Sequence, residues 1–263
     1  MVNFEWKDSY RVEDLRQIIA LLRSEEGCPW DKEQTHESIR RNFIEEVYEA
    51  CEAIDAKDPA LLQEELGDVL TQVIFHARIE EEQGRFDLDD VADASCKKFI
   101  SRHPHIFSDS QVSGTEEVLL NWDELKRKEK RYETVTQAME GVAKSLPATW
   151  RAEKIQEKAR KVGFDWPHVQ GAIGKLEEEL SELKRAIAQG SGTGEELGDL
   201  LFSAVNVARL LDLDPEEALH LASDKFTRRF AYLEQAAVER GHLLAQMTLD
   251  EMEALYQEGK HRL

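Results

Sequence analysis

The pentapeptide Glu-Glu-Leu-Gly-Asp occurs twice in this chain, at residues 64–68 and 195–199, and each copy runs directly into an apolar segment. Other features recur around it in the same order: an acidic Glu-x-x-Glu pair upstream, a Lys-Phe-x-x-Arg segment downstream, and a Gly-x-x-Trp segment further upstream. Features that recur in one order predict two copies of one domain. We expect the copies to span residues 1–132 and 148–263, with a linker at about 133–147.

The spacing of apolar residues favours helices throughout. Ile39, Phe43, Val47 and Ala50 lie three or four residues apart, as on one face of a helix, and only 6 Pro and 14 Gly interrupt the chain. Asp58-Pro59 and Asp214-Pro215 are typical helix starts. No segment alternates as a strand does. We therefore predict an all-α tandem repeat of a small antiparallel helical bundle. The apolar faces exceed what one small bundle can bury, which predicts a symmetric homodimer.

Composition limits the classes of function. The chain carries 34 Lys and Arg against 54 Asp and Glu, a net charge of −20, which disfavours binding to nucleic acid. Its 3 cysteines form no Cys-x-x-Cys pair, so we expect reduced thiols in a cytoplasmic protein. No apolar run approaches the ~20 residues of a membrane span, so we expect no membrane partner.

The acidic pairs predict a metal site. Carboxylates three residues apart share one face of a helix, and two such helices joined by a short loop direct four carboxylates to one place. Such a site suits Mg²⁺, or Mn²⁺. A solvated helix face is the alternative, but recurrence and a position beside apolar stripes favour the metal. The candidate ligands are Glu46, Glu49, Glu65 and Asp68 in the first copy and Glu179, Glu182, Glu196 and Asp199 in the second.

Gly67 and Gly198 stand within the two acidic helices. Glycine inside a helix costs ~1 kcal/mol relative to alanine. Its use at the same place twice indicates either close approach of a ligand to the backbone or a tight contact between helices.

Cationic and aromatic residues also recur. Lys and Arg four residues apart share a helix face and are suited to phosphate oxygens, although a surface pair is the alternative. These pairs are Lys98/Arg102 and Lys225/Arg229. Trp30 and Trp166 follow a glycine by three residues, and either could stack on a base or anchor a core.

A di-iron bundle is the other metal site that a carboxylate-rich helical protein could form, through Glu-x-x-His pairs. None of the four such pairs has a counterpart in the other copy or lies in an acidic Glu-Glu-Leu-Gly-Asp helix, which disfavours iron. These pairs are Glu33/His36, Glu217/His220, Glu239/His242 and Glu258/His261.

Nearly the whole chain resembles the MazG nucleoside triphosphate pyrophosphohydrolases, in their long bacterial form with two copies. The segments that carry the resemblance are GCPWDKEQTHESI, FIEEVYEA, EELGDVL, KKFISRHPHIF, VGFDW, LEEELSEL, EELGDLLF and DKFTRRF. The resemblance implies an all-α NTP pyrophosphatase fold and a dimer. It also implies Mg²⁺-dependent cleavage of nucleoside triphosphates, ATP among them, to NMP and pyrophosphate, in housecleaning of the nucleotide pool or in lowering alarmone levels.

The resemblance also implies roles for single residues, mainly in the second copy. There the acidic quartet is expected to hold the metal, and Glu178 or one of the ligands to orient the attacking water. Tyr256 stands in the last helix where the family leads us to expect Trp. The residues expected to contact the nucleotide, besides Tyr256, are Lys175, Glu178, Glu195, Lys225 and Arg229. A non-catalytic regulator that senses nucleotides or binds partner proteins is the alternative function.

Overall fold

The structure, a computed structural model, describes residues 4–108, 114, 118, 122 and 132–262. Helices and turns make up this described part of the chain, and it contains no strand. The chain divides into two compact units, Met1–Lys126 and Arg127–Leu263, and each is described here by itself. The expected domain limits at residues 132 and 148 stay a prediction.

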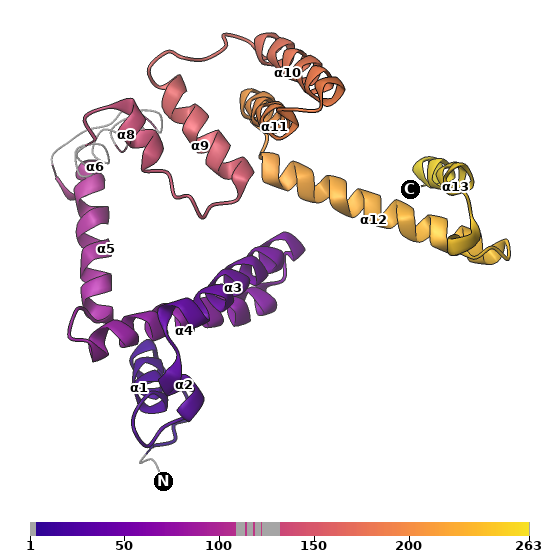
Figure 1. Ribbon diagram of the computed structural model, residues 1–263. Coiled ribbons are helices and arrows are strands. Elements are labelled where there is room, and N and C mark those ends of the chain that lie inside the picture. Colours follow the sequence, from indigo (N-terminus) through magenta and orange to yellow (C-terminus); the bar gives the residue numbers. More distant parts are fainter. Residues whose placement is uncertain (1–3, 109–113, 115–117, 119–121, 123–131, 263) are drawn as a thin grey trace. The chain divides into compact units, whose positions relative to one another are not determined.

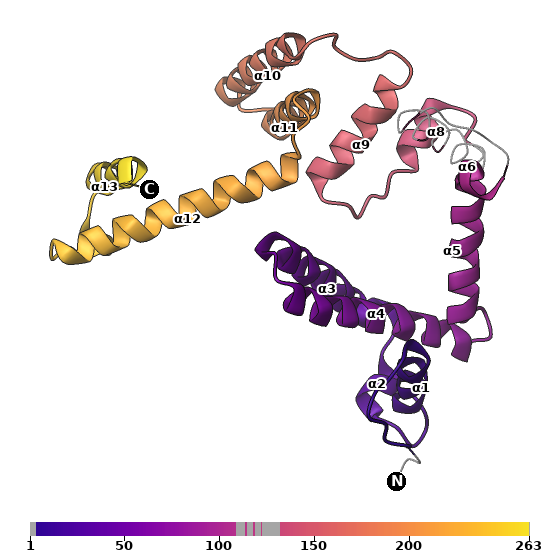
Figure 2. The ribbon, with the colours of Figure 1, turned by 180° about the vertical axis from the view of Figure 1, so that it is seen from behind.

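The first unit is built on a long antiparallel helical hairpin. Helices α3 and α4 lie side by side in both views, and α1 packs against α4 (Figures 1 and 2). The helices of this unit are α1 (Val12–Leu22), α2 (Pro29–Glu33), α3 (His36–Ala56), α4 (Pro59–Glu82), α5 (Leu88–Arg102) and α6 (Pro104–Phe107).

The second unit repeats this order. Helices α10 and α11 form the corresponding hairpin, α9 packs against α11, and the long α12 carries α13 folded back along its end (Figure 1). The helices are α8 (Val135–Glu140), α9 (Ala148–Arg160), α10 (Val169–Gln189), α11 (Thr193–Leu210), α12 (Pro215–Glu239), the 3-10 turn Leu244–Gln246 and α13 (Leu249–Arg262). Helix α8 falls in the stretch expected to be a linker and contacts α9. The prediction of an all-α tandem repeat is confirmed.

The helix ends follow local chemistry. Asp58 accepts hydrogen bonds from the first-turn backbone N–H groups of α4, and Asp214 does the same for α12, as the sequence predicts. The turn of the first hairpin places Lys57 at φ 55°, where a side chain is disfavoured. In the second hairpin Gly190 and Gly192 take the left-handed positions at φ 74° and 76°.

Each unit has a small apolar core. In the first, Ile39 of α3 meets Ile74 and Phe75 of α4, together with Ile19 of α1 and Ile79. In the second, the buried cluster lies between α12 and α13, and its members are Leu233, Ala236, Ala237 and Leu255. Large apolar side chains stay exposed on the hairpins, which leaves apolar surface for a partner to cover.

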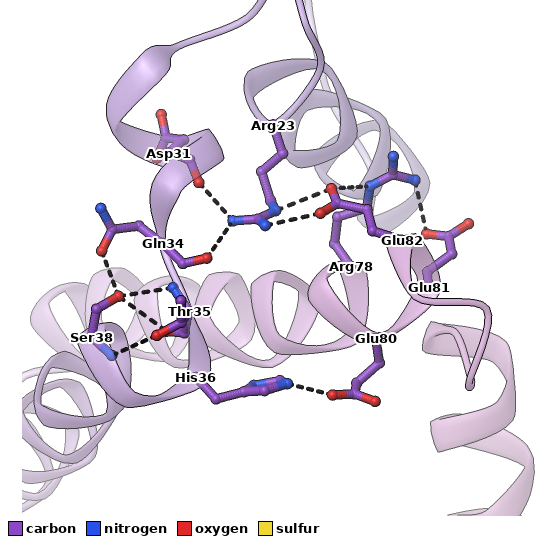
Figure 3. Close-up of polar contacts among 10 residues, drawn as sticks. All are labelled: Arg23, Asp31, Gln34, Thr35, His36, Ser38, Arg78, Glu80, Glu81 and Glu82. Atoms are coloured by element: carbon purple, nitrogen blue, oxygen red, sulfur yellow. Dashed lines mark hydrogen bonds and ion pairs between the residues drawn. The ribbon is translucent and has the colours of Figure 1, made fainter.

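A buried arginine holds the segment before α3 onto α4 (Figure 3). The Arg23 side chain is 5% exposed and donates two hydrogen bonds to the carboxylate of Glu82, at 3.1 and 2.9 Å. Nη1 of Arg23 donates hydrogen bonds to the backbone carbonyls of Asp31 and Gln34. The guanidinium also lies over the ring of Phe75. Pairing and hydrogen bonding together allow this charge to be buried.

Below this contact, His36 at the start of α3 reaches Glu80 near the end of α4 (Figure 3), and it also contacts His76 of α4. His36 Nδ1 lies 2.7 Å from His76 Nδ1, and His36 Nε2 lies 2.5 Å from a carboxylate oxygen of Glu80. Glu80 also accepts hydrogen bonds from Arg85. The His36 ring is thus held between a carboxylate and a second imidazole.

Replacement of Arg23 by alanine should reduce the free energy of unfolding by about 1–3 kcal/mol, because it leaves two backbone carbonyls without their donor and removes one arginine from the partly buried Glu82 carboxylate, which Arg78 also contacts. Urea-induced unfolding of the full chain measures this loss. The matched control is Arg41→Ala, since Arg41 pairs with Glu45 while 87% exposed. That change should cost no more than about 0.5 kcal/mol. Equal losses in the two variants would contradict a stabilising role for the buried contact.

Candidate metal centre

The hairpin of the second unit brings three of its four predicted ligands together. Carboxylate oxygens of Glu179 on α10 and of Glu196 and Asp199 on α11 all lie within 4.8 Å of one another. Glu179 is buried, Glu196 is half-buried and Asp199 is exposed. Glu182 lies outside this group, where its carboxylate accepts a hydrogen bond from Arg185 at 2.8 Å. Three oxygens of this kind can hold one divalent cation.

The first unit contains the same arrangement with a different fourth member. Glu46 and Glu49 on α3 converge with Glu65 on α4 within 4.8 Å, and Asp68 lies outside the group. In the first unit the cluster lies between the turn of the hairpin and the core residues Ile39, Ile74 and Phe75. The spacing of the acids predicts four converging carboxylates in each copy, and the structure brings three of each four within 4.8 Å of one another. Their role as metal ligands stays a prediction.

Repulsion among these carboxylates is visible in their ionisation. Burial raises the pKa of the Glu196 carboxyl, and the negative charges of Glu182 and Glu179 raise it further. In the first unit, burial raises the pKa of Glu46, and the charges of Asp68 and Glu49 add to it. A hard cation bound among the oxygens would relieve this repulsion, so the donor set fits Mg²⁺ or Mn²⁺.

One cation is built into the second site. The Nζ of Lys175 lies 2.8 Å from carboxylate oxygens of both Glu178 and Glu179, and these hydrogen bonds raise the pKa of the lysine. The residue at the corresponding position of the first copy, 133 residues earlier, is Asn42. The two acidic clusters therefore differ in charge, although their acids match. This difference is readable by aligning the copies and was missed in the sequence interpretation.

The helix glycines face open space. A Cβ at Gly67 or Gly198 would meet no atom within 4 Å in the described chain. A tight contact between helices of one chain is therefore not their reason, and close approach of a ligand or of a second chain stays a prediction. Glu195 is likewise exposed on α11.

The cationic pair of the second copy lies on α12. Lys225 is exposed and Arg229 is half-buried. Among the described residues, no ion pair or hydrogen bond joins either cation to the acids of α10 and α11. Tyr256 of α13 packs against Phe226 of α12, with ring centroids 5.6 Å apart. The structure thus places the tyrosine against α12, while the acids of α10 and α11 form a separate cluster.

The two tryptophans differ in setting. Trp30 stands on the short α2 and is 63% exposed. Trp166 precedes α10, is 44% exposed, and packs against the backbone of Gly171. Neither residue is part of a buried core cluster. Of the four Glu-x-x-His pairs weighed for iron, Glu33/His36 does not form a unit, because His36 turns to Glu80 and His76.

Comparison with known proteins decides the family. The MazG nucleotide pyrophosphohydrolase domain matches residues 34–107 and 169–232, which contain both acidic hairpins in large part. The chain belongs to the MazG family. The nucleoside triphosphate pyrophosphohydrolase/pyrophosphatase MazG of Thermotoga maritima is 43% identical over 94% of this chain and 95% of its own length. The nucleoside triphosphate pyrophosphohydrolase of Escherichia coli is 40% identical over 96% of this chain and 98% of its own length.

A third MazG relative has a different organisation. The uncharacterised protein YabN of Bacillus subtilis is 46% identical over 93% of this chain, but the match covers 50% of YabN. The two-copy MazG unit therefore occurs both nearly alone and as half of a longer protein. Within the residues that the structure describes, no helix combines the length and apolarity that crossing a membrane requires.

Proposed function

We propose that the chain is a Mg²⁺-dependent nucleoside triphosphate pyrophosphohydrolase that converts an NTP and water to NMP and pyrophosphate. The observation that carries this proposal is the convergence of Glu179, Glu196 and Asp199 at one point of the α10–α11 hairpin. Membership of the MazG family and the names of two relatives that match nearly end to end support it. We place Glu182 as a fourth ligand, which its rotation away from Arg185 would allow.

The residues of the second copy have different roles in the proposed hydrolysis. The bound cation would supply charge neutralisation and polarisation of the phosphate oxygens. Glu178 is exposed beside the cluster, and we assign it the orientation or deprotonation of the attacking water. Lys175 would pass from the carboxylates to the phosphates as the nucleotide arrives. Glu195, exposed at the start of α11, would contact the nucleotide.

A second chain would complete this site. The acids on the α10–α11 hairpin are not joined to the cations on α12, and exposed apolar side chains flank both: Leu197, Leu201, Phe202, Leu219 and Phe226. Burial of such faces is the main driving force for association. We therefore propose a homodimer in which the apolar faces are covered and phosphate-binding cations meet the acids. Tyr256, packed on Phe226, would then lie at the nucleotide.

Replacement of Glu196 by glutamine keeps the size of the side chain but removes a charged ligand. We expect Mg²⁺ affinity and NTP turnover to fall together, with calorimetry and pyrophosphate release as the measurements. If the first copy is also active, the single variant keeps a residual rate that the double variant Glu65→Gln/Glu196→Gln loses. Unchanged turnover at saturating Mg²⁺ in the double variant would contradict the assignment of Glu65 and Glu196 as metal ligands.

The arginine of α12 provides a test of phosphate binding. Arg229→Ala should lower kcat/KM by about 10²–10³, by analogy with loss of one preorganised donor to developing charge. The melting temperature should change little. The paired variant is Arg102→Ala, at the corresponding position of α5, which should have a much smaller effect if the second copy dominates turnover. Equal losses would show that both copies are active, and no loss in either would contradict the phosphate role.

The proposed homodimer can be tested by its mass in solution. Light scattering at micromolar concentration should give about twice the chain mass of 30.2 kDa. Substitution of exposed Leu201 by glutamate would place a charge on the apolar face of α11 and should shift the particle toward the single chain. A particle of chain mass for the unsubstituted protein would contradict the proposal.

The composition supports a class of ligand and a cellular location for the proposed activity. A net charge of −20 supports small nucleotides with bound Mg²⁺, rather than nucleic acid, as ligands. Cys28, Cys51 and Cys96 are all free, which supports the cytoplasm as the location. In that compartment we propose a role in clearing the nucleotide pool. A regulator that binds nucleotides without cleaving them is the competing function, and intact NTP after long incubation with Mg²⁺ would favour it.

A further inference from the structure

An exposed tryptophan lies on bare backbone at the start of α10. A Cβ added to Gly171 would lie 2.5 Å from the Trp166 ring, so the ring rests directly on the helix backbone and only glycine leaves room for it. A Cβ at Gly174 would meet no atom within 4 Å. The surface next to the ring is therefore open and free of side-chain bulk, and 44% of Trp166 remains exposed.

This tryptophan stands on the same face of α10 as the charged site. Lys175 follows Gly171 by four residues, one turn further along the helix, or about 6 Å, and Glu179 follows by one more turn. A flat apolar ring, an ammonium and a metal-binding carboxylate thus succeed one another along a single helix. A nucleotide presents a base, a sugar and phosphates in a comparable order and over a comparable length.

A buried ion pair fixes the loop that carries the ring. Asp165 accepts hydrogen bonds from Arg209 of α11 at 3.1 and 2.5 Å and from the backbone N–H of Trp166 at 2.9 Å. The Arg209 side chain is 6% exposed and is also held by Asn206. Burial opposes ionisation of Asp165, but the hydrogen bonds and charge of Arg209 outweigh it, so the pKa of this acid is lowered. The carboxylate is therefore a fixed anchor for the ring.

The first copy lacks this arrangement. Ser38 takes the position of Gly171, 133 residues earlier, and its hydroxyl is bonded to Gln34. Trp30, the counterpart of Trp166 in the sequence repeat, lies on α2, and its carbonyl accepts a hydrogen bond from Gln34. Asn42 replaces Lys175. The ring, the bare backbone and the ammonium are thus a combination found in the second copy alone.

We infer that Trp166 is the stacking platform for the nucleobase in the second copy, and that Asp165 and Arg209 are positioning residues that hold it there. The inference rests on the proposed function only in that it takes the Lys175 and Glu179 end of α10 as the phosphate site. The ring would recognise the base by its π-face and the acidic cluster would take the polyphosphate. Base and phosphate recognition then belong to different residues.

Base recognition and phosphate recognition can be separated by comparing a ligand that has a base with one that has none. Calorimetry in Mg²⁺ compares an α,β-methylene analogue of ATP, which cannot be cleaved between those phosphates, with inorganic tripolyphosphate. Trp166→Ala should lower the affinity for the ATP analogue by about 10- to 100-fold, the range expected for loss of one base–aromatic stack. The affinity for tripolyphosphate should stay within about twofold of that of the unsubstituted protein. Trp166→Phe should recover most of the affinity. Trp30→Ala, on a more exposed ring of the first copy, should change the affinity for neither ligand.

The positioning residues have a matching readout. Asp165→Asn keeps an oxygen that accepts hydrogen bonds from Trp166 N–H and Arg209. It should therefore lower the affinity for the ATP analogue less than Asp165→Ala does, and neither variant should change the affinity for tripolyphosphate. In turnover, these variants should raise KM for an NTP more than they lower kcat. Equal weakening of both ligands would show a merely structural role, and an analogue unaffected by Trp166→Ala would overturn the platform.

The outcome is independent of the cleavage assay. If the unsubstituted protein binds the analogue through Trp166 but cleaves no NTP, the pyrophosphohydrolase proposal is lost and the platform stands. If it cleaves NTP while Trp166→Ala binds the analogue normally, the platform is lost and the activity stands. Binding of neither ligand by the unsubstituted protein would also overturn the platform.

Discussion

Mutual repulsion of carboxylates is the constraint around which both hairpins are organised. Acids on two helices are held within 4.8 Å, although a helix pair normally buries apolar side chains where its members meet. The hairpins tolerate this because apolar side chains are buried elsewhere along them, among them Ala53 near the turn of the first and Ala186 near the turn of the second. In the first unit the core of Ile39, Ile74 and Phe75, with the buried Arg23, fastens the end of the hairpin away from the turn. The acids are thereby left for a cation.

The two copies solve the same electrostatic problem differently. The second copy carries Lys175 against its acids, while the first has the uncharged Asn42 at the corresponding position. An internal ammonium lowers the repulsion in the free protein, and it also competes with a metal for the same oxygens. Duplication followed by one such change can give two sites with the same acids and different affinities for cations.

Local chemistry explains how much the sequence could predict. The helix starts at Asp58 and Asp214 depend on neighbours within one turn, and the convergence of the acids depends on two helices that follow one another in the sequence, so sequence patterns indicate both. Contacts between distant segments were not predictable in this way. The pairing of Arg23 with Glu82 spans 59 residues and no pattern indicates it, and a glycine such as Gly198 gives no sign of whether a helix or open space lies opposite.

The histidine pair beneath the Arg23 contact makes the first unit sensitive to acid in two stages. Only one proton fits between nitrogens 2.7 Å apart, so a second charge on the rings would force them apart. Burial, with the charge of His36, lowers the pKa of His76 below 6.5, so the unfolded chain takes up that proton first and stability falls as the pH drops through this value. Hydrogen bonds from Arg85 and His36 lower the pKa of Glu80 to about 2, so its contribution is lost between about pH 4.5 and 2. Mild acid would therefore weaken the histidine contact between α3 and α4 first, and the contribution of Glu80 would be lost only at lower pH.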